Sequence, residues 1–183
     1  MTIPRVLGIA GSLRAGSYNR RLLESATEAL PQAEWRIARL RAIPPYDADV
    51  EARGLPPAVR QFKDEIEAAD ALVIATPEYN RSVPGVLKNA IDWASRPAHR
   101  SPLVGKPTLL MGASPGRRGA QQALEHLRQI LESTDAMPLP DVVSVARVKE
   151  RLPGGEPDGE LRAELRAALA RLPLREPVGG RSG

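Results

Sequence analysis

Short apolar runs recur along the chain and have the length of β-strands. They occupy residues 5–10, 35–40, 71–76, 107–113 and 139–145. The first, third and fourth runs are nearly continuous in apolar residues, which is the pattern of strands covered on both faces of a parallel sheet. The sequence therefore predicts five strands, with these three inside the sheet.

Between the strands, apolar residues repeat with the period of a helix that buries one face. The clearest faces are Leu22, Leu23, Ala26 and Leu30; Val86, Leu87, Ala90, Ile91 and Ala94; Leu124, Leu127, Ile130 and Leu131; and Leu161, Leu165, Ala168, Leu169 and Leu172. Residues 56–69 form a weaker helical pattern, which is the second of the five in chain order. Five strands alternating with five helices predict a doubly wound α/β fold, because parallel neighbours need right-handed crossover connections.

The chain of 183 residues suits a single domain, which we place at residues 1–172. Residues 41–57 form a proline-rich connection, and residues 151–159 form a turn-rich loop before the last helix. Residues 173–183 have no apolar periodicity, so we expect a disordered tail there.

Composition narrows the possible partners. The 26 basic and 22 acidic residues leave a net charge of +4, but only 3% of residues are aromatic, which disfavours nucleic-acid binding. The positive charge has two possible explanations. Basic residues could attract phosphorylated cofactors, or the arginines could simply be solvated at the surface. No apolar stretch is long enough to span a bilayer, so we expect a cytoplasmic protein without a membrane partner.

Several kinds of catalytic site are disfavoured. The chain has no cysteine, which excludes disulfides, thiolate metal sites and cysteine nucleophiles. His99 and His126 are not spaced for a metal site or a nucleophile relay, and the carboxylates form no metal-like cluster. We therefore predict no metal, and both histidines are interpreted as surface or packing residues.

Ligands of open parallel sheets bind beyond the carboxyl ends of the strands. Three loops reach that edge: the first loop is residues 10–19 (AGSLRAGSYN), the second loop is residues 76–85 (TPEYNRSVPG) and the third loop is residues 113–121 (ASPGRRGAQ). The candidate chemistry of the chain therefore lies in these three segments.

The first loop has the properties of a phosphate cradle. It leads directly into a helix, whose leading N–H groups favour an anion, and Gly11 and Gly16 let the backbone approach closely. Its polar side chains are Ser12, Arg14, Ser17 and Asn19. The lysine of a nucleoside-triphosphate loop and the GxGxxG dinucleotide pattern are both absent, so a phosphate monoester fits better. The alternative is a tight turn in which Ser17 or Asn19 only caps the helix.

The second and third loops could border a flat ligand. TPEYN must turn across the top of the sheet, where its backbone groups could contact the edge of a heterocycle. Ordinary packing of Tyr79 and solvation of Glu78 are the alternatives. In the third loop, Arg117 and Arg118 could attract an anionic second substrate, or they could simply be exposed.

Three motifs together resemble a known family. GSLRAGSYNR at 11–20, TPEYNRSVPGVLKNAIDW at 76–93 and SPGRRGAQQALEHLRQIL at 114–131 are similar to the NADPH-dependent FMN reductases, a flavodoxin-like family that includes quinone, azo-dye and chromate reductases. The resemblance runs from about residue 5 to residue 170. The third motif departs from the pattern, because the family often has a pair of glycines where this chain has Gly119 followed by Ala120.

The resemblance implies a five-stranded parallel sheet of order 2-1-3-4-5 and a noncovalently bound FMN. The implied phosphate ligands are Ser12, Arg14, Ser17 and Asn19; the isoalloxazine ring would lie along Pro77, Glu78, Tyr79 and Asn80; and Ser114 and Gly116 would border its other side. The flavin itself is named by the resemblance and not by the spacing of these residues.

The resemblance also implies a reaction. Hydride would pass from NADPH or NADH through FMN to a quinone or similar acceptor by ping-pong kinetics, with no essential catalytic side chain. A homodimer or homotetramer formed through the third and fourth helices is expected. The alternatives are a flavodoxin-type electron carrier that does not oxidise NAD(P)H, and a flavin-free domain of the same fold. Such carriers are generally acidic and hold the ring between aromatics, whereas this chain is basic and offers only Tyr79 near the ring.

Overall fold

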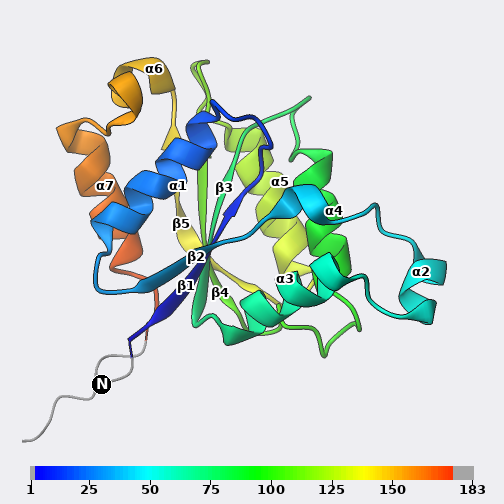
Figure 1. The fold of residues 1–183 in the computed structure, drawn as a ribbon. Helices are drawn as coiled ribbons and strands as arrows, with labels where there is room; N and C mark the ends of the chain where they lie inside the picture. The colour runs from blue at the N-terminus through cyan, green and yellow to red at the C-terminus, as the bar shows by residue number, and fades with distance from the viewer. Residues whose placement is uncertain (1–2, 175–183) are drawn as a thin grey trace, which may run out of the picture.

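The apolar runs form a five-stranded, all-parallel sheet in the computed structural model, which describes residues 3–174 (Figure 1). The strands are β1 (Arg5–Ala10), β2 (Glu34–Ile37), β3 (Ala71–Thr76), β4 (Pro107–Ala113) and β5 (Met137–Val145). Their order is β2-β1-β3-β4-β5, which confirms the predicted topology. Every residue of β3 is buried, as its continuous apolar sequence requires at the centre of a sheet.

The two edge strands differ in length from the prediction. β2 ends at Ile37, before the predicted end at residue 40, because the chain turns into the short 3₁₀ helix η1 (Leu40–Ala42), which buries Leu40. β5 begins two residues earlier than predicted, at Met137, and includes two prolines. Edge strands tolerate proline because one row of their backbone groups needs no partner.

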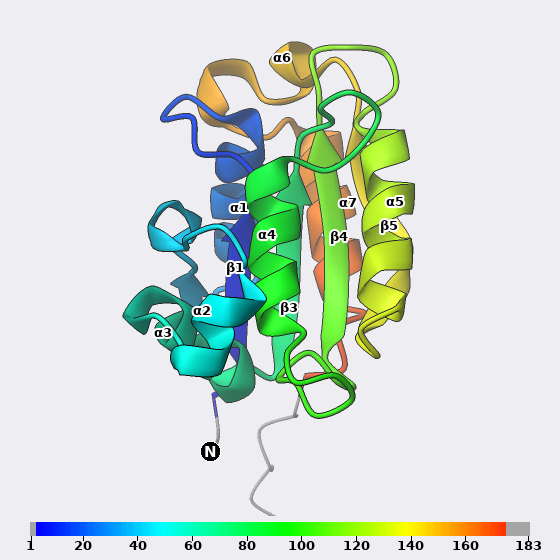
Figure 2. The ribbon, with the colours of Figure 1, turned by 90° about the vertical axis from the view of Figure 1, so that its right-hand side faces the viewer.

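Helices cover both faces of the sheet. Helices α1 (Tyr18–Ala29) and α7 (Gly159–Leu169) lie on one face; α3 (Pro57–Ala68), α4 (Gly85–Ala94) and α5 (Gln121–Glu132) lie on the other (Figures 1 and 2). Each face buries its own apolar core, because successive strand residues point to opposite sides. Leu7 and Ile9 of β1 pack under α3 and α4, whereas Val6 packs under α1.

The proline-rich connection contains a helix that the sequence did not indicate. Residues 41–57 include α2 (Ala48–Arg53), a single six-residue segment. Asn89 and Trp93 of α4 hold the connection in place, since both side chains donate a hydrogen bond to the Pro44 carbonyl oxygen at 2.8 Å. These two polar groups therefore have a structural function.

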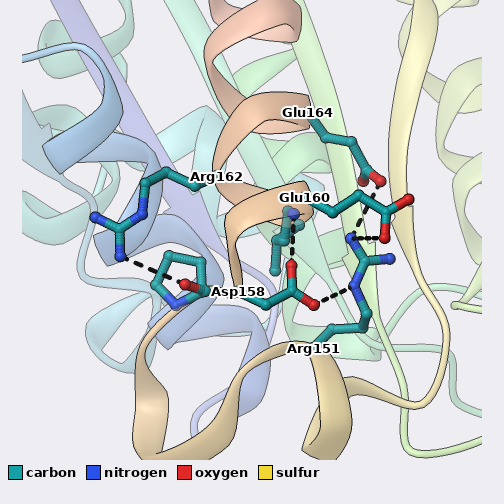
Figure 3. A network of polar contacts seen from close by, with 7 residues as sticks. Arg151, Asp158, Glu160, Arg162 and Glu164 are labelled. Carbon is teal, nitrogen blue, oxygen red and sulfur yellow. Dashed lines mark hydrogen bonds and ion pairs between the residues drawn. The ribbon is translucent and has the colours of Figure 1, made fainter.

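The predicted loop at residues 151–159 is also partly helical. It follows α6 (Val148–Arg151) and contains the 3₁₀ turn η2 (Pro153–Gly155). Figure 3 shows that Arg151 fastens this segment to α7: its guanidinium lies 2.7 Å from Asp158 and 3.1 Å from Glu164. Asp158 also caps α7, because its carboxylate accepts a hydrogen bond from the Leu161 N–H at 2.6 Å.

Most of the predicted tail, residues 175–183, lies outside the described residues. Leu174, which falls inside that predicted tail, packs partly buried against the core under α1 and α7. Across residues 3–174, no helix is both long enough and apolar enough to cross a membrane.

Replacing Asp158 is expected to weaken the junction between α6 and α7. Asp158→Ala should lower the free energy of unfolding by about 1–2 kcal/mol, because a helix cap and the partner of Arg151 are lost together. Denaturation by urea at pH 7 measures this difference. An unchanged midpoint and slope for the variant would contradict the assignment.

The same contacts predict a pH dependence. The Leu161 N–H, and next the Arg151 guanidinium, hold the pKa of Asp158 below its usual value. The resulting stabilisation is complete above the ordinary carboxyl pKa of about 4, and it is lost as the pH falls through the lowered pKa. Asp158→Asn is the matched control, since it keeps a capping oxygen but should show a shallower loss of stability in acid than the parent.

Candidate functional site

Three loops meet at one end of the sheet. The register aligns Ala10 with Ala75 and Thr76 with Gly112, so β1, β3 and β4 end at nearly the same level. Figure 2 shows the segments that follow these strands gathered at the end of the sheet that also carries α6. The structure thus brings together the three loops that the sequence singled out.

Gly11 allows the first loop to pass close to β3. Its N–H donates to the Ala75 carbonyl oxygen at 2.8 Å. A Cβ atom at this position would lie 3.1 Å from both Thr76 Oγ1 and Leu87 Cδ2, which is tighter than a side chain normally allows. A larger residue at this position would force Thr76 or Leu87 to shift, so glycine suits the close approach of the first loop to β3.

The first turn of α1 presents free N–H groups. Ser17 is the N-cap, and its buried Oγ accepts a hydrogen bond from the Arg20 N–H at 3.3 Å. Among the described residues, no hydrogen bond takes up the N–H groups of Tyr18 or Asn19, as expected for a helix start. The first turn has no acidic residue to compete for this positive end. The alternative in which Ser17 caps the helix is therefore realised, and donors for an anion are still left over.

Arg14 extends beside this helix start. Its guanidinium Nη2 lies 3.9 Å from the position that a Cβ atom would take on Gly16, and its side chain is exposed. The Arg14 N–H contacts Ser12 Oγ at 3.4 Å, which folds the loop back on itself. The guanidinium of Arg14 therefore lies next to Gly16, the residue that precedes the N-cap of α1.

Asn19 points away from this cradle, into the protein. Its Nδ2 donates to the Ala113 carbonyl oxygen at 2.9 Å, and its Oδ1 accepts from the Ala113 N–H at 2.8 Å. The residue is only 3% exposed. In the register of β3 and β4, Ala113 lies opposite the first position beyond the end of β3, so the Asn19 amide gives Ala113 the two partners that a longer β3 would supply. What Asn19 can present to a ligand is its backbone N–H.

The second loop contains a two-residue turn in an unusual conformation. Tyr79 and Ser82 exchange two backbone hydrogen bonds of 2.9 and 3.0 Å, and the residues between them, Asn80 and Arg81, have φ angles of 51° and 65°. Positive φ at both central positions defines a type I′ turn, which normally favours glycine at the second. Tyr79 is 48% exposed, so the turn presents an aromatic side chain and backbone groups at the edge of the site.

Two side chains fasten the second loop to α5. The Glu78 carboxylate accepts hydrogen bonds from the N–H groups of Gln122 at 3.0 Å and Ala123 at 3.3 Å. Ser82 Oγ lies 2.8 Å from His126 Nδ1. Glu78 thus neutralises the positive end of α5, and that helix start is not open to an anionic ligand. The Glu78 carboxylate is therefore engaged within the protein and is not a free group of the second loop.

The third loop is joined to the segment that follows β5. The Arg147 N–H donates to the Gly116 carbonyl oxygen at 2.9 Å, and the Val148 N–H donates to the Ser114 carbonyl oxygen at 3.1 Å. Sequence reasoning missed residues 146–148 as part of the site, because they carry no motif and α6 is too short for a periodic pattern. Ala120, which replaces a glycine of the related pattern, adopts a left-handed φ of 63° at the start of α5.

Comparisons with known proteins identify the family of the chain. A family model for NADPH-dependent FMN reductases matches residues 4–150. The chain belongs to this family. An NAD(P)H-dependent FMN reductase of Pseudomonas aeruginosa is 54% identical over 136 residues, which are 74% of this chain and 73% of that protein. A quinone reductase of Escherichia coli is 45% identical over 137 residues, or 73% and 72% of the two chains.

A solved structure extends the likeness to nearly the whole fold. The flavoenzyme NAD(P)H:(acceptor) oxidoreductase of Paracoccus denitrificans superimposes with a TM-score of 0.81 at 32% identity, covering 92% of this chain and 96% of that one. The two chains therefore share the same overall fold.

In this FMN reductase, replacing Asn19 is expected to disturb the first loop and β4 together. Asn19→Ala should lower the free energy of unfolding by about 2–4 kcal/mol, because the N–H and C=O of Ala113 both lose a buried partner. Asn19→Asp keeps an acceptor for the Ala113 N–H, so a smaller loss is expected there. Chemical denaturation of the three proteins checks the order, and equal stability of Asn19→Ala and the parent would contradict it.

Proposed function

We propose that this chain binds FMN and oxidises NAD(P)H, passing the electrons to a quinone or a similar small acceptor. The observation that carries the proposal is the start of α1: two free N–H groups and the Arg14 guanidinium, with no carboxylate in the first turn. This donor set fits a phosphate monoester, because helix N-termini favour anions and arginine matches phosphate oxygens in a bidentate geometry. FMN carries one such group.

The second and third loops provide the proposed binding surface for the flavin ring. We place it along the backbone of Pro77, Glu78, Tyr79 and Asn80, with Ser114 and Gly116 of the third loop on its other side. The type I′ turn and the tether from Glu78 to α5 support this placement, because they fix the backbone donors and acceptors of the second loop. Ser12, Ser17 and the Asn19 N–H complete the phosphate site beside Arg14.

No side chain of the chain needs to act as an acid or base in this proposal. When bound, FMN supplies the hydride chemistry between the nicotinamide and the acceptor. The loops orient the ring, and the N-terminus of α1 holds its phosphate. The exposed edge of the site admits NAD(P)H and the acceptor in turn, which is the basis for expecting ping-pong kinetics.

A flavodoxin-type carrier is the second candidate, and the names of the relatives disfavour it. The proteins of Pseudomonas aeruginosa and Escherichia coli carry reductase names. The net charge of +4 also differs from that of the generally acidic carriers. Assembly as a homodimer or homotetramer through α4 and α5, and a cytoplasmic location, stay predictions.

One experiment tests the function. The purified protein, saturated with FMN, is expected to oxidise NADPH or NADH when a benzoquinone is present, and to do so without a second protein. Bound flavin should give the protein a yellow colour. A protein that takes up FMN but leaves both nucleotides unoxidised would instead behave as an electron carrier, and a colourless protein that ignores added FMN would overturn the proposal.

Arg14 is expected to contribute directly to FMN binding. Arg14→Ala should weaken FMN binding at least about tenfold, because a hydrogen bond to a charged group contributes about 1.5–3 kcal/mol. Fluorescence titration of FMN measures the dissociation constant. Arg60→Ala is the matched control, since Arg60 lies on α3 beside Arg5 and Glu34, the first residues of β1 and β2 at the far end of the sheet. Equal losses in both variants would indicate a general charge effect.

A further inference from the structure

Exposed basic residues gather where the third loop meets the segment after β5. We call Arg117, Arg118, Arg147 and Lys149 the basic rim, and all four residues are exposed. The 2.9 Å hydrogen bond from the Arg147 N–H to the Gly116 carbonyl oxygen places Arg147 beside the residue that precedes Arg117. Two segments separated by about thirty positions in the sequence therefore present their cations at one edge of the site.

The third loop and the segment after β5 form a fixed frame for this rim. Ser144 Oγ donates to the Gly119 carbonyl oxygen at 2.9 Å, and the Ser114 N–H donates to the Val145 carbonyl oxygen at 3.0 Å. A Cβ atom on Gly119 would lie 2.5 Å from Ser144 Oγ, so the two backbones are in close contact. The positions of the rim residues relative to one another are therefore set by the backbone.

Arg147 differs sharply from its neighbour Arg151. Figure 3 shows Arg151 held by Asp158, Glu160 and Glu164, so its charge is balanced by carboxylates. Within residues 3–174, no ion pair involves Arg147, Arg117 or Arg118. Glu150, the acidic residue of α6, is exposed and forms no ion pair in the same range. The positive charge of the rim is therefore left for a ligand.

The backbone of Arg147 adds a second observation. Its φ and ψ angles are 47° and 45°, in the left-handed region. Glycine and asparagine adopt this conformation most easily, and arginine has no local advantage there. Residues held in such conformations cluster at functional sites. An arginine at this position thus points to a function for its side chain.

We infer that Arg147, together with Arg117 and Arg118, binds the ribose 2′-phosphate of NADPH and sets a preference for NADPH over NADH. The inference rests on the proposed NAD(P)H oxidation and deepens it. The two nucleotides differ only by this phosphate, and arginine is the residue type that recognises it in dinucleotide sites. In the proposed function the first loop binds the FMN phosphate, so the cations of the basic rim are not needed to bind that phosphate.

The test removes the guanidinium without straining the backbone. Arg147→Gly and Arg147→Asn suit the left-handed conformation, so both variants should fold. With FMN saturating and a benzoquinone as acceptor, kcat/KM is measured for NADPH and for NADH. We expect the ratio of the NADPH value to the NADH value to fall about tenfold or more. Arg60→Gln, which removes one charge at the far end of the sheet, should change neither value.

A binding measurement separates this inference from the proposed function. Calorimetric titration should show that adenosine 2′,5′-bisphosphate binds the parent protein more tightly than 5′-AMP, and that Arg147→Gly loses this difference. If the parent oxidises neither nucleotide but keeps the preference for the 2′-phosphate, only the proposed function fails. If the parent oxidises both nucleotides and the Arg117, Arg118 and Arg147 triple alanine variant keeps the original NADPH to NADH ratio, the assignment of the basic rim is overturned. An equal fall in both kcat/KM values would also overturn it, since it would indicate a structural effect.

Discussion

Two hydrogen bonds between Asn19 and the backbone of Ala113 join the first turn of α1 to the end of β4, and the site depends on them. They form just beyond the point where β3 ends, at the position where Ala113 has no strand partner on that side. Together with the hydrogen bond from Gly11 to Ala75, they fix the N-terminus of α1 relative to the ends of β3 and β4. With them, the free N–H groups that favour a phosphate are held at a defined place.

In the proposed site, side chains fix the scaffold and the backbone is left to contact the ligand. The side chains of buried Asn19 and partly buried Glu78 are both hydrogen-bonded to other elements, so they position the loops. Glu78 also occupies the N-terminus of α5, so that helix cannot bind an anion there. The N-terminus of α1 has free N–H groups and an arginine nearby. This division has a physical cause: a flat heterocycle presents hydrogen-bonding groups around its edge, and a rigid turn of backbone can match them without losing side-chain entropy.

The sequence predicted the fold well where burial was decisive. The continuous apolar runs of β1, β3 and β4 and the helical faces of α1, α4 and α5 were found with nearly correct boundaries, since each pattern reports its own burial. The short helices α2 and α6 were missed because six or four residues cannot show a period. Their positions depend on tertiary contacts: Glu51 of α2 pairs with Tyr46 and Arg96, and Arg151 of α6 pairs with Asp158 and Glu164. The loops were located correctly, but whether the Asn19 side chain points outward or inward depends on where β3 ends, and no local pattern contains that information.

The arginines near the third loop also divide into those that hold the structure together and those that are free to contact a ligand. Arg151 and Arg147 lie four residues apart, yet one is surrounded by three carboxylates and the other has no ion pair among residues 3–174. The Arg151 side chain is partly buried, so leaving its charge without a partner would be costlier than at an exposed position. An exposed guanidinium bears no such cost, and it can therefore stay uncompensated until an anion arrives. The net positive charge of the chain therefore points to an anion site only where basic residues have no acidic partner. Arg147, beside the third loop, is such a residue.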